Sequence, residues 1–186
     1  MKKLPLILIF VFLASFIFSQ EKTEKNIFLS FFLSFMKPSQ SEKLVWHDFN
    51  QGVAKGIAEK KPIVISFYTD WCPYCKKMEA EVFNSPKIKP MFQNDFIPVR
   101  LNGEDLKYTI RYQEKTYTVE QFLYSLQIQG FPSTGFLDSK GTIITVIPGF
   151  IPADVFESLL LYMKESCYEK SMPLEEFMKK ANSCAQ

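Results

Sequence analysis

Residues 63–75 read IVISFYTDWCPYC and join a run of apolar residues to two cysteines in the spacing Cys-x-x-Cys. The run at residues 63–68 is rich in β-branched residues and is broken only by Ser66, which is typical of a strand covered on both faces in a parallel sheet. A helix is expected directly after Cys72, because Pro73 suits a first helical turn and good helix formers follow it. The sequence therefore predicts a buried strand leading into a cysteine at a helix N-terminus.

This placement favours redox chemistry at Cys72. The helix dipole and the unpaired backbone N–H groups stabilise an anion, so the pKa of this thiol is expected to lie below the value of about 8.5 for a free cysteine. Cys75 follows one helical turn later, is expected to be the more buried of the two, and is the natural resolving thiol. The pair is therefore expected to form a redox-active disulfide that exchanges with a partner disulfide.

Metal and haem sites fit these cysteines less well. A four-cysteine zinc site would most simply use a second close pair, whereas Cys167 and Cys184 lie far apart and the only histidine is His47. A haem attachment site requires histidine after the second cysteine, where this chain has Lys76. No metal and no organic cofactor are therefore expected, and His47 is expected to be a surface or capping residue.

Two separated motifs resemble the thioredoxin superfamily: WCPYC at residues 71–75 with the strand before it, and GFPS at residues 130–133. The chain looks most like exported bacterial thioredoxin-like thiol–disulfide proteins, and the resemblance covers roughly residues 44–163. It implies a cis peptide bond before Pro132, facing the active cysteines. It also implies that Phe131 and Pro132 dock the extended chain of the substrate.

The residue six positions before the first cysteine departs from the family pattern. Many thioredoxins carry a buried aspartate there, which helps the resolving thiol to lose its proton, whereas this chain has Ser66. The acid–base group that assists Cys75 is therefore missing or supplied elsewhere. Glu79 and Glu81 are the candidates.

The dipeptide between the cysteines bears on the direction of the reaction. Pro73-Tyr74 is the dipeptide typical of glutaredoxins. Two features argue against a cytosolic glutathione-dependent enzyme: Trp71, which the resemblance implies shields the site, and a predicted export signal. The chain also lacks the Pro-His dipeptide of the strong periplasmic oxidant, which favours a reductase. A binding or carrier module of the same fold, in sulfur metabolism or cytochrome maturation, is the alternative.

The N-terminal residues predict export. Two lysines precede an apolar run at residues 4–18, and Ser19 suits a cleavage position, so residues 1–19 are predicted to be a secretory signal peptide. An uncleaved membrane anchor is the alternative. Residues 20–43 are expected to be a linker with a second, shorter apolar segment at 27–36. The expected location is the bacterial periplasm, either free or tethered to the membrane.

Composition and charge bear on the partners. The formal net charge is +2, and loss of residues 1–19 removes two lysines and leaves no net charge. No basic cluster is interleaved with aromatic residues, so nucleic acid is not an expected partner. The aromatic content of 16% is mostly phenylalanine, which indicates a core. The expected partners are protein thiols or disulfides and an unidentified redox donor.

The resemblance implies a thioredoxin-like domain at residues 44–186, and the order of strands and helices predicted by hydrophobic periodicity and turn signals agrees with it. Its class is α/β, with a central mixed β-sheet flanked by helices, an inserted hairpin and a C-terminal extension at residues 167–186. Strands are expected at residues 44–46, 63–68, 96–101, 134–137 and 142–147, and the inserted hairpin at 108–112 and 115–119. Helices are expected after a capping box of Asp48 and Gln51, after Cys72, and at residues 120–127, 153–164 and 173–182.

The second cysteine pair lies in the C-terminal extension. Cys167 is expected to end the helix at 153–164, and Cys184 to end the helix at 173–182. An even cysteine count in an oxidising compartment favours a structural disulfide between them, with two free thiols as the alternative. Such a bridge would pin the tail to the domain.

Overall fold

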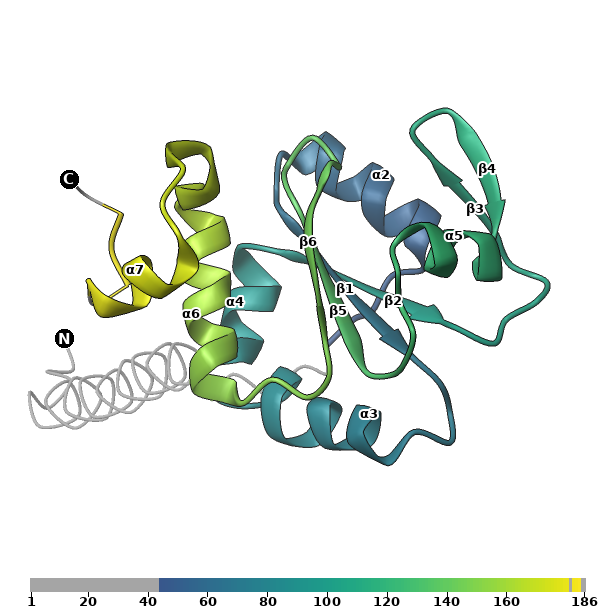
Figure 1. Ribbon diagram of the computed structural model, residues 1–186, viewed down its shortest axis with the longest axis horizontal. Coiled ribbons are helices and arrows are strands. Elements are labelled where there is room, and N and C mark those ends of the chain that lie inside the picture. Colours follow the sequence, from purple (N-terminus) through teal and green to yellow (C-terminus); the bar gives the residue numbers. More distant parts are fainter. Residues whose placement is uncertain (1–43, 181, 185–186) are drawn as a thin grey trace, which may run out of the picture. The chain divides into compact units, whose positions relative to one another are not determined.

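The strand predicted at residues 63–68 is β1 (Ile63–Tyr68), an interior strand of a four-stranded sheet with the order β2-β1-β5-β6 (Figure 1). The computed structural model describes residues 44–180 and 182–184. The partner strands are β2 (Ile97–Asn102), β5 (Ser133–Leu137) and β6 (Ile143–Pro148). β1 runs parallel to β2 and antiparallel to β5, and β5 runs antiparallel to β6, which confirms the predicted mixed sheet.

Helices cover both faces of this sheet (Figure 1). They are α2 (Phe49–Glu59), α3 (Pro73–Lys77), the π-helical turn η1 (Met78–Phe83), α4 (Ile88–Asn94), α5 (Val119–Ser125) and α6 (Ala153–Lys164). Side chains of β1 alternate between two cores: Val64 packs with residues of η1, α4 and α6, whereas Ile65 and Phe67 pack with residues of α2 and α5. Burial on both faces explains why β1 reads as a continuous apolar run.

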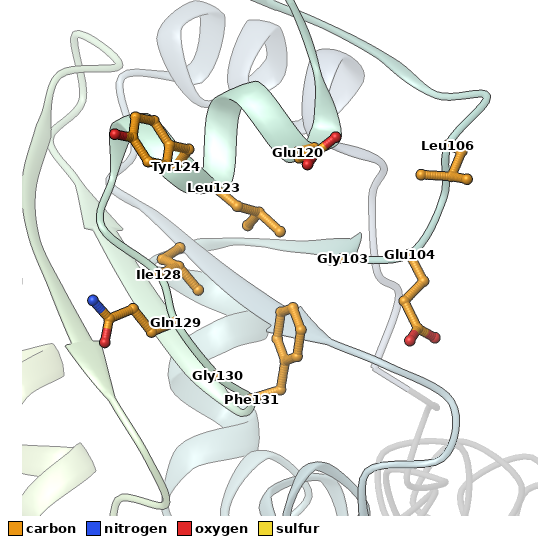
Figure 2. A pocket seen from close by; sticks show the side chains of 10 residues that line it. All are labelled: Gly103, Glu104, Leu106, Glu120, Leu123, Tyr124, Ile128, Gln129, Gly130 and Phe131. Atoms are coloured by element: carbon orange, nitrogen blue, oxygen red, sulfur yellow. The ribbon is translucent and has the colours of Figure 1, made fainter.

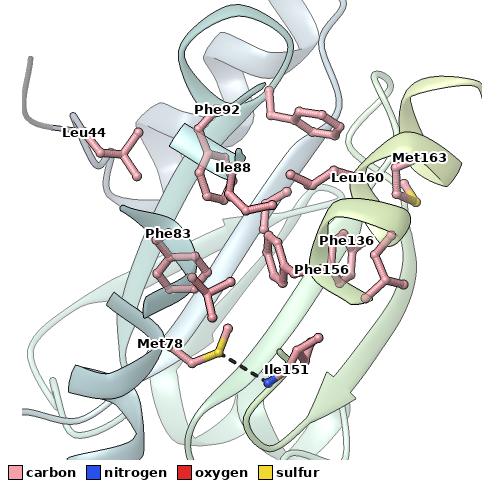
Figure 3. Close-up of a cluster of buried hydrophobic side chains, with 14 residues drawn as sticks. Leu44, Met78, Phe83, Ile88, Phe92, Phe136, Ile151, Phe156, Leu160 and Met163 are labelled. Carbon is pink, nitrogen blue, oxygen red and sulfur yellow. Dashed lines mark hydrogen bonds between the residues drawn. The ribbon is translucent and has the colours of Figure 1, made fainter. Parts of the chain in front are cut away.

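One core holds α3 in place, which is called the redox helix below because Cys72 and Cys75 lie at its start. Phe83, Phe92 and Phe156 come from three different helices, and their ring centroids lie 5.5 to 6.0 Å apart (Figure 3). Met78, fully buried at the end of the redox helix, accepts the backbone N–H of Ile151 at 3.4 Å. Edge-to-face aromatic packing of this kind adds to the free energy gained by burial. The helix that carries the cysteines is thus anchored along its buried side.

The predicted hairpin insertion is present as a separate two-stranded sheet, β3 (Thr109–Tyr112) and β4 (Lys115–Thr118). Tyr108 ties it to α2, because its hydroxyl donates to Asp48 at 2.8 Å and accepts the backbone N–H of Asn50 at 3.0 Å. Burial raises the pKa of Tyr108 to about 12. A capping box of Thr118 and Gln121, which was not predicted, starts α5 directly after β4.

The first predicted strand, at residues 44–46, is wrong. The chain makes a single parallel bridge between His47 and Val99 and then enters α2 at Phe49, so too few residues remain extended for a strand. One of the two hydrogen bonds of the predicted capping box is present: the Asp48 carboxylate accepts the backbone N–H of Gln51. α4 had no prediction, because the proline at position 90 and the breakers at 84–86 obscure its helical pattern.

The C-terminal extension also differs in detail from the prediction. α6 ends at Lys164, and Ser166 adopts a left-handed conformation with a φ of 52°. Cys167 therefore begins a separate 3₁₀ turn, η2 (Cys167–Lys170), rather than ending α6. The last helix, α7 (Leu174–Lys179), is shorter than predicted, and Cys184 lies beyond its end.

The predictions of a signal peptide at residues 1–19 and a linker at 20–43 lie outside the described residues. Across the part of the chain that is described, no helix has both the length and the apolar character needed to cross a membrane.

Candidate redox site

Cys72 and Cys75 are joined in a disulfide at the start of the redox helix, with their Cα atoms 5.3 Å apart. Cys72 is the N-cap residue of α3, and Pro73 occupies the first turn, as predicted. The backbone N–H of Cys75 points at the Cys72 sulfur at 3.1 Å. In the reduced protein the same N–H and the positive end of the helix dipole are available to stabilise a Cys72 thiolate.

The order of burial of the two cysteines is the reverse of the prediction. Cys72 is 2% exposed and Cys75 is 9% exposed, so the first cysteine is the more covered. The reason is the N-cap geometry, which folds the Cys72 sulfur back over the first turn towards the Cys75 amide. The exposed residues of this segment are Trp71, Pro73 and Tyr74.

The Phe131–Pro132 peptide bond is cis, as expected from the resemblance. Pro132 is buried, and its carbonyl accepts the backbone N–H of Gly149 at 2.8 Å. Ser133, the next residue, pairs with Phe67 across the sheet. This register puts the cis-proline beside the end of β1 from which the chain leads into the cysteines.

Trp71 lies at the edge of the site and is 66% exposed. Its indole N–H donates to a carboxylate oxygen of Glu104 at 2.9 Å. Glu104 follows β2 and was not predicted as a site residue, because no local pattern links positions 33 residues apart. Shielding by Trp71 and docking at Phe131 and Pro132 remain predictions.

A cavity of about 240 Å³ is bordered by Cys75 and by the buried Ser66. Glu79 also borders it, one helical turn after Cys75, and forms an ion pair with Arg100 from β2. Burial lowers the pKa of Arg100, whose guanidinium stacks on Trp46 at 4.4 Å from the ring centroid. Ser66, at the position that carries aspartate in many thioredoxins, therefore borders the same cavity as a glutamate from the helix.

Glu81, the other candidate from the sequence, lies away from this cavity. Its side chain is 59% exposed and faces Lys77 at 3.8 Å. Of the two glutamates, Glu79 alone borders the cavity with Cys75.

The second cysteine pair forms a disulfide between Cys167 and Cys184, with Cα atoms 5.8 Å apart. Both residues are buried with Phe177 in a small core of the extension. Together with Glu165 they bring three possible metal-ligand atoms within 4.8 Å of one another. Because the two sulfurs are bonded to each other, neither is a free thiolate, which is the form that binds metals.

A Cys-x-x-Cys disulfide at a helix N-terminus, beside a cis-proline on a mixed sheet, defines a thioredoxin-fold disulfide protein. Residues 49–164 match the family model of the thioredoxin-like domain. This match covers more than half of the chain, and the chain belongs to that family.

Curated relatives include thiol–disulfide redox proteins. The thiol:disulfide interchange protein DsbD of Pectobacterium atrosepticum is 30% identical over 115 residues, which is 61% of this chain and 18% of that protein. The chloroplastic thioredoxin-like protein HCF164 of Oryza sativa is 26% identical over 102 residues, 55% of this chain and 34% of that protein. The chain thus spans about a third or less of the length of these relatives. Their homology supports oxidoreductase chemistry at the cysteine pair.

Solved structures show the same fold. A thioredoxin-fold protein from Helicobacter pylori aligns with a TM-score of 0.54 at 19% identity, covering 66% of this chain and 80% of that one. A thioredoxin from Thermus thermophilus aligns with a TM-score of 0.51 at 18% identity, covering 67% and 87%.

Proposed function

We propose that the protein is an exported thiol–disulfide oxidoreductase that reduces disulfides in partner proteins through Cys72 and Cys75. The observation that carries the proposal is the disulfide between these residues, capped by the Cys75 N–H and lying at the start of the redox helix. The predicted signal peptide at residues 1–19 supports a periplasmic location, free or tethered. Homology to DsbD, named as an interchange protein, supports exchange with protein thiols.

The reaction begins with the reduced pair. The Cys72 thiolate attacks one sulfur of a partner disulfide, a bond forms between them, and the other partner sulfur leaves as a thiolate. Cys75 loses its proton and attacks Cys72, which breaks the mixed disulfide, releases the second partner thiolate and forms the Cys72–Cys75 disulfide. Two electrons pass to the partner, and its two thiolates take up the protons lost by the cysteines. A separate dithiol donor reduces the pair again.

We further propose that Glu79 accepts the proton of Cys75 in the second step. Glu79 and the buried hydroxyls of Ser66 and Thr69 border the same cavity as Cys75. A cavity of about 240 Å³ with these polar groups in its lining is large enough for water, which can carry the proton between Cys75 and Glu79. Arg100 holds the carboxylate in place through the ion pair.

Replacement Glu79→Gln is expected to slow the release of partner from the mixed disulfide by about a hundredfold, because a positioned general base typically contributes about 10²- to 10⁴-fold. Stopped-flow measurement of the second step against pH checks this, and the loss should shrink at high pH, where Cys75 ionises without help. The matched control is Glu81→Gln, which removes the same charge outside the cavity. Equal rates for both variants would remove Glu79 from the mechanism.

The test of the proposed function is capture of partners by Cys75→Ser. This variant keeps the nucleophile and lacks the resolving thiol, so mixed disulfides should accumulate in the native compartment. Peptide mapping is expected to place every captured partner on Cys72. Recovery of no partner refutes the proposal, and stable capture by the wild type without turnover indicates the carrier function instead.

A further inference from the structure

A pocket of about 660 Å³ opens beside Phe131, between the loop after β2, helix α5 and the segment before the cis-proline (Figure 2). This volume lies within the range of about 300 to 1,000 Å³ found for ligand pockets. Apolar side chains make up much of its lining: Leu106, Leu123, Tyr124, Ile128 and Phe131. The pocket can therefore hold a large apolar group.

The pocket adjoins the redox site through two links. Phe131 in its wall immediately precedes Pro132. Glu104, also in its lining, accepts the indole N–H of Trp71, the residue before Cys72. Gly103 allows this arrangement, because a Cβ at that position would overlap the ring of Phe131. A chain docked at the cis-proline would thus pass the mouth of the pocket.

Exposed apolar residues are concentrated around these two features. Leu106 is 82% exposed and Tyr124 is 86% exposed, and both border the pocket. Trp71 and Tyr74, at the redox helix, are 66% and 58% exposed. Large apolar side chains left in water beside a cleft are typical of surfaces that bind other molecules.

The charges of the lining are of one sign. Glu104 and Glu120 are its two charged residues, and Figure 2 shows Glu104 on the loop after β2 with Leu106, and Glu120 on α5. Among the described residues that border this pocket none is basic. A lysine or arginine of the occupant would meet complementary charge here.

We propose that this pocket receives an apolar side chain of the partner polypeptide, adjacent in sequence to a lysine or arginine, while the partner's cysteine reacts at Cys72. The inference rests on the proposed function and names its substrate class: disulfides flanked by an apolar–basic pair. The apolar residue occupies the space between Leu123 and Phe131, and the basic residue pairs with Glu104 and Glu120.

The test uses the full, reduced protein and synthetic peptides whose single cysteine is in a mixed disulfide with glutathione. One series carries Phe-Arg at successive positions on either side of the cysteine, and matched series carry Ser-Arg or Phe-Glu. Bis(2-hydroxyethyl) disulfide serves as a substrate too small to fill the pocket. The second-order rate constant for each probe is the readout.

The wild type is expected to reduce the best Phe-Arg peptide about tenfold faster than its Ser-Arg match, as burial of one apolar side chain predicts. Leu106→Ser with Tyr124→Ser should abolish that preference, whereas Val45→Ser, an exposed apolar control away from the pocket, should keep it. Glu120→Gln should lower the preference for Phe-Arg over Phe-Glu about threefold and weaken its salt dependence. Glu114→Gln, at the turn of the β3–β4 hairpin, is the charge control.

The possible outcomes separate this inference from the function on which it rests. Equal rates for all peptides, with normal reduction of the small disulfide, overturn the pocket and leave the proposed function standing. Failure to reduce any probe overturns the proposed function itself. A wild-type dimer that Tyr124→Ser converts to a monomer, without peptide selectivity, would assign the pocket to a second copy of the chain.

Discussion

Replacement Cys72→Ser is expected to abolish the reduction of insulin disulfides, lowering the rate by more than about a thousandfold. The physical reason is that a serine hydroxyl does not ionise near neutral pH and cannot form the mixed disulfide, whereas a thiol at this N-cap has its anion stabilised by the Cys75 N–H. The measurement is the turbidity assay with dithiothreitol as the electron donor.

Cys75→Ser is the matched control for this loss. It removes the other member of the same disulfide, so both variants lack the Cys72–Cys75 bond and have the same serine content. Cys75→Ser should react once with a partner disulfide and stop, whereas Cys72→Ser should not react at all. Equal single-turnover reactivity of the two variants would show that Cys72 is not the nucleophile.

Replacing both Cys167 and Cys184 with alanine is expected to lower the free energy of unfolding by about 3 kcal/mol. The two residues are separated by 17 positions, and a closed loop of that size restricts the unfolded chain by about this amount. Urea unfolding of the oxidised wild type and the double variant, followed by circular dichroism, measures the difference.

The corresponding double alanine variant of Cys72 and Cys75 provides the comparison. These residues are separated by 3 positions, so the same chain-entropy argument gives a smaller loss of about 1.5 kcal/mol. A loss at the C-terminal pair no larger than that at the redox pair would contradict a structural role for the Cys167–Cys184 disulfide.

The predictable parts of the fold are those governed by local pattern. β1 matches its prediction residue for residue, because a strand buried on both faces has an unbroken apolar run. α6 matches as well, since Phe156, Leu159, Leu160 and Met163 recur at helical spacing on its buried face. The cis-proline was predictable through the resemblance, which linked GFPS to the cysteine motif.

The parts that were not predictable depend on contacts between distant residues. Arg100 on β2 forms an ion pair with Glu79, and Glu104 in the following loop accepts a hydrogen bond from Trp71. No local sequence pattern predicts either contact. The burial of Cys72 was misjudged for a related reason: exposure depends on how the N-cap folds the sulfur over the first turn. The pocket beside Phe131 likewise forms only when three separate segments meet.

The redox potential of the Cys72–Cys75 couple decides whether it donates electrons to partner proteins. The potential is obtained by equilibrating the protein, with the Cys167–Cys184 disulfide intact, in dithiothreitol buffers of known poise. Reducing proteins of the thioredoxin and glutaredoxin kind lie at about −200 mV or below. We expect a value in that range, whereas a value of about −120 mV, typical of a strong oxidant, would show that the couple does not act as a reductant.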